Sequence, residues 1–232
     1  SQTGSDIKNL SWNIPGGTPS FSQDSIVDIT FSEVGEYEIK LVVSGPNGVD
    51  SISKFIRVFD GNNGTKAPVY YAFENGTLPD DIQIYNNEAS DQKWETLSSL
   101  GADNTEGCIF LNNAISGGGR GAYFETPFYD FTDNPKPNMS YYYAYAKYSE
   151  NQSDTFRIEY TLDCGKTWKT FPGISGPNTM ANNTGGVTSN AFYPDGAQQW
   201  KKVTLTSAFQ SLFKNKPSVK LRFYFRADPA SS

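Results

Sequence analysis

The chain has 232 residues, 37% of them hydrophobic and 19% charged, with a net charge of −6. This length and apolar content suffice for one large or two ordinary folded domains. The lysines and arginines are scattered and form no basic patch, so we expect no nucleic acid partner. No apolar run approaches the roughly 20 residues of a membrane helix, so we expect no membrane insertion.

The sequence contains no histidine and only two cysteines. Histidine is the usual general base at neutral pH and the commonest zinc ligand. Catalysis by Ser/His/Asp or Cys/His groups, and histidine-based zinc hydrolysis, are therefore excluded within this chain. Glycosidase chemistry needs only two carboxylates across one cleft, but no pattern here indicates that geometry. We predict no zinc site and no enzyme activity.

High glycine, proline and aromatic contents favour an all-β fold of short strands joined by turns. Apolar and polar residues alternate in the first part of the chain, in segments bounded by Gly or Pro. The expected strands there cover residues 11–14, 26–31, 35–44 and 50–59. This spacing predicts a small β-sandwich over residues 1–60, followed by a linker over 61–68.

The strings "SWNIPGG" and "VGEYEIKLVVSGPNGVDSISKFIRVF" resemble the polycystic-kidney-disease (PKD) type of immunoglobulin-like domain. The resemblance implies that Trp12 fills the sandwich interior and that Tyr37 packs in the core. That family has further strands before the position of Trp12, and we expect these first strands to be missing.

Eight further strands are expected in the second part of the chain. They cover residues 69–76, 93–100, 108–114, 122–131 with a kink at Pro127, 139–148, 154–171, 200–209 and 218–228. For 93–100 a short turn of helix is the alternative to a strand. With no convincing helix longer than two turns, this pattern predicts a larger jelly-roll β-sandwich over residues 69–232. A long polar segment over 172–199 is a functional or mobile loop.

The ordered strings "FENGTLPD", "CIFLNN", "AYFETPFYDF", "DTFRIEYTLDCGKTW" and "LRFYF" resemble the cleaved-adhesin, choice-of-anchor and MAM-like jelly-roll domains of secreted Bacteroidetes proteins, including pappalysin-like metalloproteases. The family continues into one more strand, which we expect to be missing. The resemblance implies a non-catalytic accessory or adhesion region, secreted or on the outer surface, whose partner is an extracellular protein or glycan. Two alternatives stay open: a glycan-binding module, or accessory domains of a zinc metalloprotease whose catalytic domain lies outside this chain.

The jelly-roll resemblance also points to a structural calcium site. Glu74 takes the place of the acid in the family's first strand, and Asn112 and Asn113 supply amide oxygens nearby. Oxygen ligands suit calcium. The other interpretation is that Glu74 caps a turn and the two asparagines only donate and accept hydrogen bonds.

Cys108 and Cys164 are either bridged or two separate thiols. An oxidising exterior permits a disulfide, which would stabilise the fold by about 3 to 4 kcal/mol. The sequence does not give the Cα separation that decides between the two.

Tyrosines cluster over 141–148, and alternation places some of them on the outer face of a strand, where they can stack on sugar rings. Tyr141, Tyr143, Trp94 and Trp200 are the candidate ligand-binding residues. The other interpretation is that these aromatic side chains fill the core or cover a sheet.

The octet "TLDCGKTW", residues 161–168, matches the Asp-box pattern of sialidase propellers. It occurs once and without a blade repeat, so we interpret it as a hairpin turn. Asp163 is expected to accept hydrogen bonds from turn amides and Gly165 to adopt a positive φ.

Overall fold

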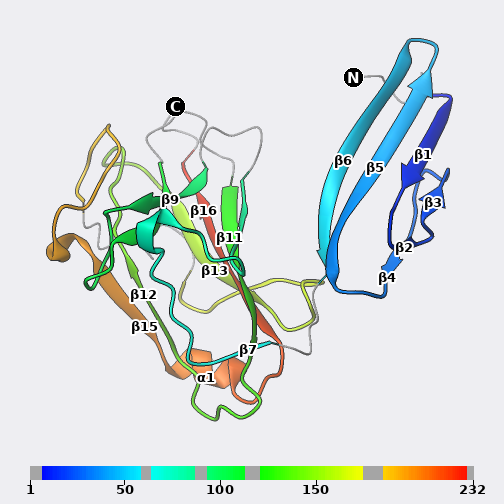
Figure 1. Cartoon of the computed structure of the whole chain (residues 1–232). Helices are drawn as coiled ribbons and strands as arrows, with labels where there is room; N and C mark the ends of the chain where they lie inside the picture. Colours follow the sequence, from blue (N-terminus) through cyan, green and yellow to red (C-terminus); the bar gives the residue numbers. More distant parts are fainter. Residues whose placement is uncertain (1–6, 59–63, 87–92, 113–120, 175–184, 229–232) are drawn as a thin grey trace. The chain divides into compact units, whose positions relative to one another are not determined.

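The computed structural model describes residues 7–58, 64–86, 93–112, 121–174 and 185–228 (Figure 1). It divides into two compact units, Ser1–Asp60 and Gly61–Ser232. The regular secondary structure of the described residues is nearly all strand, with one short α-helix, which confirms the all-β prediction. None of the helices in these ranges is long and apolar enough to cross a membrane.

The first unit is built on one antiparallel sheet of strand order β3-β1-β5-β6, with a separate pair of β2 and β4. Its strands are β1 (Asn9–Asn13), β2 (Gly17–Thr18), β3 (Phe21–Ser22), β4 (Thr30–Phe31), β5 (Gly35–Gly45) and β6 (Gly48–Val58). The long hairpin of β5 and β6 stays in register from Gly35↔Val58 to Gly45↔Gly48. This hairpin corresponds to the two expected strands over 35–44 and 50–59, which carry the strongest alternation.

Only one end of this sheet is covered. Ile14 and Ile39 are buried there, and Tyr37 stacks on Phe31 at 4.4 Å between ring centroids. Gly16 has a φ of +78°, and a Cβ at that position would lie 2.4 Å from the Tyr37 ring, so only glycine fits this turn.

The second unit is a two-layered sandwich. One layer is a six-stranded sheet of order β14-β13-β16-β11-β7, with β8 also paired to β11. The other layer consists of two separate two-stranded sheets, β10-β9 and β12-β15 (Figure 1). The bounds of the first layer are β7 (Thr65–Lys66), β8 (Gln83–Tyr85), β11 (Gly121–Asp130), β13 (Thr155–Thr161), β14 (Lys169–Thr170) and β16 (Val219–Arg226). Those of the second are β9 (Trp94–Ser98), β10 (Gly107–Leu111), β12 (Met139–Tyr143) and β15 (Lys201–Leu205).

Aromatic side chains from both layers and from α1 (Ser207–Phe213) form the core of this unit. Phe171, Phe209 and Phe213 are among its fully buried members. Trp94 of β9, Leu111 of β10 and Tyr141 of β12 pack against this cluster from the second layer.

Strand β11 bends where the sequence predicts a kink. Its register with β16 shifts between Glu125 and Phe128, around Pro127. Proline has no N–H for the ladder. The neighbouring Thr126 hydroxyl pairs with Leu221 instead: it accepts from the Leu221 amide at 3.1 Å and is placed to donate to the Leu221 carbonyl at 3.4 Å.

The outer face of the six-stranded sheet carries charged side chains between aromatic rings. The Arg222 guanidinium lies 4.1 Å from the Tyr123 ring centroid and 3.8 Å from that of Trp168. The buried Glu125 carboxylate pairs at 2.7 Å with both Lys220 and Arg222. These charged groups pair with one another and with the rings beside them, so the side chains of this face cover it themselves.

Several expected elements differ from the structure. The strand over 26–31 is reduced to β4, the strand over 139–148 ends at Tyr143, and the strand over 154–171 is divided into β13 and β14. The linker over 61–68 contains β7, because Thr65 and Lys66 pair in parallel with β11. The strand over 200–209 ends at Leu205, and α1 begins two residues later. The strand over 69–76 is replaced by an irregular segment and a 3₁₀ turn, η2 (Glu74–Gly76), because no strand pairs with it in the described part of the chain.

Candidate ligand-binding site

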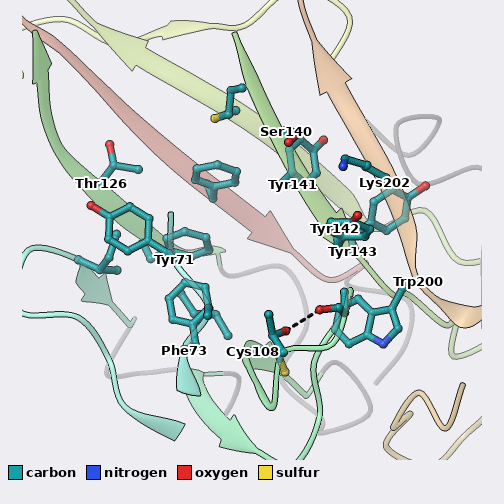
Figure 2. Close-up of a pocket in the computed structure, with 18 of the residues that line it drawn as sticks. Tyr71, Phe73, Cys108, Thr126, Ser140, Tyr141, Tyr142, Tyr143, Trp200 and Lys202 are labelled. Atoms are coloured by element: carbon teal, nitrogen blue, oxygen red, sulfur yellow. Dashed lines mark hydrogen bonds between the residues drawn. The ribbon is translucent and has the colours of Figure 1, made fainter. Parts of the chain in front are cut away.

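A cavity of about 740 Å³ lies between the two layers of the second unit (Figure 2). This volume falls within the roughly 300 to 1,000 Å³ of small-molecule sites. The cavity arises because the second layer is split: β10 and β12 belong to separate sheets, and both strands line it. The irregular segment 67–73 also lines it, and Figure 2 shows Tyr71 and Phe73 among its walls.

The inner part of the cavity is aromatic. Its floor is formed by inward-facing residues of the six-stranded sheet, among them Phe124 and Phe223, which stack at 4.7 Å between centroids. Trp94 meets Phe124 edge-on at 5.2 Å, and Tyr141 meets Phe223 edge-on at 6.0 Å. Burial raises the pKa of Tyr141 above its usual range, so its hydroxyl stays neutral.

The outer part of the cavity is polar, and we call its four residues Asp103, Tyr142, Trp200 and Lys202 the mouth cluster. Tyr142 and Lys202 face each other across β12 and β15, with the Lys202 Nζ 5.1 Å from the Tyr142 ring centroid. The Tyr142 hydroxyl donates a hydrogen bond to the Asp103 carboxylate at 2.8 Å. The hydrogen bond with Tyr142 raises the pKa of Lys202, which keeps this amine charged.

One buried donor in the cavity wall has no partner among the described residues. It is the indole Nε1 of Trp94, although the Trp94 backbone is held by Asn86, whose side chain both accepts from its N–H and donates to its carbonyl. A buried donor without a partner costs about 1 to 3 kcal/mol. A bound ligand with an acceptor can remove that cost.

The structure brings the four sequence-predicted ligand residues to this one cavity. Tyr141 and Tyr143 face inward and pack against the core, as Trp94 does, while Trp200 belongs to the mouth cluster. The outward tyrosine of the strand is Tyr142, which the sequence reasoning missed. Lys202 and Asp103 were also missed: the Tyr142↔Lys202 pairing depends on strand register, and Asp103 lies in a distant loop.

Of the calcium candidates, Glu74 begins η2 and Asn112 directly follows β10. The Glu74 carboxylate accepts a hydrogen bond from the Glu106 amide at 2.8 Å, Asn112 lines the cavity, and Asn113 lies outside the described residues. Within the described ranges, no three acidic, histidine or cysteine side chains are grouped so that they could hold a metal ion.

Both cysteines are free in the structure. Cys108 lies in β10 and lines the cavity, where burial raises the pKa of its thiol to about 11. Cys164 is exposed in the turn between β13 and β14. The two thiols therefore belong to different sheets, and no bridge joins them.

The octet over 161–168 joins β13 to β14 as a hydrogen-bonded turn. The Asp163 carboxylate accepts from the Thr167 hydroxyl at 2.5 Å, from the Thr167 amide at 2.9 Å and from the Thr161 hydroxyl at 2.7 Å, and these bonds lower the pKa of Asp163 to about 2. Gly165 has a φ of +88°. Trp168 then packs on Arg222 at the outer face, away from the residues that line the cavity.

No protein-family model matches the sequence, and no curated protein matches it either. Among solved structures, the chain is similar to one determined for a study of the promiscuous specificity of carbohydrate-binding modules from the β-sandwich superfamily. The match covers 95% of this chain and 78% of that chain, at 16% sequence identity and a TM-score of 0.33.

Proposed function

We propose, from the residues of the cavity, that the second unit is a non-catalytic module that binds a carbohydrate at the mouth cluster. The observation that carries this proposal is the combination of an aromatic pair, a cationic donor and an anionic acceptor at one opening. Trp200 and Tyr142 provide the rings, Lys202 the donor and Asp103 the acceptor.

A sugar needs these groups together. Its ring has an apolar face that packs on an aromatic side chain, and its hydroxyls both donate and accept hydrogen bonds. The Lys202 ammonium donates hydrogen bonds and the Asp103 carboxylate accepts them, so one sugar hydroxyl can accept from Lys202 while its neighbour donates to Asp103. Ion-pair recognition of a purely anionic ligand is disfavoured because the Asp103 carboxylate lies beside the cation.

The wider setting proposed for this module follows from the two family resemblances of the sequence. A PKD-like first unit would act as a spacer, and the chain would be an accessory or adhesion region of a secreted or surface protein. The all-β fold of both units supports this setting. Its partners would then be extracellular glycans or glycoproteins.

The proposal is tested by screening the intact chain on a glycan array and measuring the tightest oligosaccharide by titration calorimetry. Tyr142→Ala and Lys202→Ala should each weaken binding by about tenfold, since each removes a contact worth more than about 1 kcal/mol. Tyr85→Ala and Lys169→Ala are matched controls, because neither residue lines the cavity.

The controls should bind like the unaltered chain. A blank array with a folded sample, or equal losses in the mouth and control variants, contradicts the proposal.

We also propose that calcium stabilises the second unit through Glu74, Asn112 and Asn113, as the family resemblance implies. Saturating calcium should raise the unfolding temperature of the unaltered chain, and Glu74→Gln should abolish that rise, because the variant loses the only carboxylate of the set. Differential scanning calorimetry with and without a chelator measures this. Magnesium is the control ion, and an equal rise in the Glu74→Gln variant rules this ligand set out.

A further inference from the structure

The cavity extends well past the mouth cluster, and its inner part is unsuited to a sugar. Phe124, Phe223 and Phe225 line it from one layer, and Leu111 and Tyr141 line it from the other. A sugar hydroxyl placed among these rings would lose water without gaining a full set of partners, which costs about 1 to 3 kcal/mol for each group. The interior therefore favours hydrocarbon.

Charge is confined to the opening. Among the residues that line the cavity, the charged side chains at neutral pH are Asp103 and Lys202, and both belong to the mouth cluster. The other ionisable groups are tyrosines and Cys108, and burial raises the pKa of Tyr141 and of Cys108, so that both stay neutral. The charge of the cavity lining is thus concentrated at the mouth cluster.

The indole Nε1 of Trp94 is buried without a hydrogen-bond partner among the described residues, and this adds a second requirement for the ligand. Trp94 lines the cavity and packs against Phe124 and Phe225 of the floor, so this donor lies in the apolar part. A hydrocarbon chain alone leaves it without a partner. An acyl chain brings a carbonyl oxygen that can accept from it.

We propose that the cavity takes an amphiphilic glycoconjugate, with its sugar at the mouth cluster and its acyl chain in the aromatic interior. The sugar part of this proposal rests on the proposed function above. The acyl-chain part is inferred from the aromatic lining of the interior. The ligand class is an acylated sugar such as a glycolipid, whose two halves match the two ends of the cavity.

The first test is a chain-length series on the intact chain, below micelle-forming concentrations. Methyl, butyl, hexyl and octyl β-D-glucosides and β-D-galactosides are titrated by calorimetry, with 1-hexanol as the chain without a sugar. Each methylene that enters the interior should tighten binding about fourfold. Leu111→Trp narrows the interior and should flatten the dependence on chain length.

The second test compares Trp94→Phe with the unaltered chain, using glucose 6-O-octanoate and octyl glucoside as probes. The variant keeps a ring and loses the N–H donor. It should weaken binding of the octanoyl ester severalfold more than binding of octyl glucoside, because both probes lose the same ring contact and only the ester also loses the N–H donor. Thermal unfolding followed by circular dichroism checks that Trp94→Phe and Leu111→Trp fold. The chain-length series on the unaltered chain does not depend on either variant.

The outcomes separate the two proposals. If methyl glycosides bind and longer chains add nothing, the interior does not take a chain and the amphiphile is excluded, while the glycan proposal stands. If 1-hexanol binds as well as hexyl glucoside, the sugar is not recognised and both proposals fail. A steady gain with chain length, lost in Leu111→Trp, supports the amphiphile.

Discussion

The two units use the same alternating strand pattern and bury their apolar side chains to different degrees. In the first unit, Ile52 and Ile56 lie on one face of β6 and remain 57% and 40% exposed. In the second unit, the equivalent alternation on β16 leaves Leu221 and Phe225 buried. The difference is the extent of the second layer, because a sheet buries its apolar face only against a second element.

This comparison explains why the candidate site lies in the second unit. A cavity needs two walls, and in the described part of the chain the second unit has two extensive layers, whereas the first unit adds only the short β2–β4 pair to its main sheet. The split of its second layer between β10 and β12 then opens the interior. The two layers of the second unit thus form the walls of the cavity, and the separation of β10 from β12 gives the cavity its opening.

The largest expected effect is the loss of stability when a core residue of the second unit is truncated. Phe213→Ala in the second unit should lower the free energy of unfolding by about 3 to 5 kcal/mol, because it empties a fully buried aromatic site. Ile52→Ala in the first unit should cost less than about 1 kcal/mol, because that side chain is mostly exposed.

Urea unfolding followed by tryptophan fluorescence reports mainly on the second unit, which contains Trp94, Trp168 and Trp200. Circular dichroism covers both units. If Phe213→Ala and Ile52→Ala lowered the free energy of unfolding equally, the difference in burial between the two units would have no energetic consequence, which would contradict this account.

A smaller effect is expected from the charged groups of the two sheets. Glu125→Gln should destabilise the second unit by about 3 kcal/mol, because it leaves the buried Lys220 and the adjacent Arg222 without their carboxylate. Glu38→Gln on β5 is the control, since Glu38 is exposed, and it should change the free energy of unfolding by less than about 0.5 kcal/mol. The same urea series measures both, and a neutral Glu125→Gln would show that the ion pairs contribute nothing.

The smallest effect is expected in the turn over 161–168, which needs no second layer. The pKa of Asp163 is lowered to about 2 by hydrogen bonds that its ionised form accepts. A lowered pKa in the folded state means that this stabilisation is complete above the ordinary value of 3.8 and is lost as the pH falls through about 2. Carbon-detected NMR of the Asp163 carboxyl follows the titration, with Asp80 for comparison, and a midpoint near 3.8 would contradict the turn geometry.

Local pattern predicted much of the fold. The alternation over 35–44 and 50–59 gave β5 and β6, and Pro127 marked the shift in β11. The strand expected over 69–76 was wrong, because its apolar alternation says nothing about whether a neighbouring strand is present to pair with it.

The candidate site was harder to predict than the fold. Residue type was enough to select Tyr141, Tyr143, Trp94 and Trp200, which all line the cavity. Single-sequence alternation could not say which tyrosine faces out, because one residue of register exchanges the two faces of a strand. Asp103 joins Tyr142 through a contact between residues 39 positions apart, which no local pattern reveals.

The most direct test of glycan binding between the layers is an NMR titration of the ¹⁵N-labelled intact chain with the tightest oligosaccharide from the array. We expect chemical-shift changes to centre on Asp103, Tyr142, Trp200 and Lys202, with the indole N–H of Trp200 among the largest. Changes confined to the first unit, or to the outer face around Tyr123 and Trp168, would contradict a ligand site between the two layers.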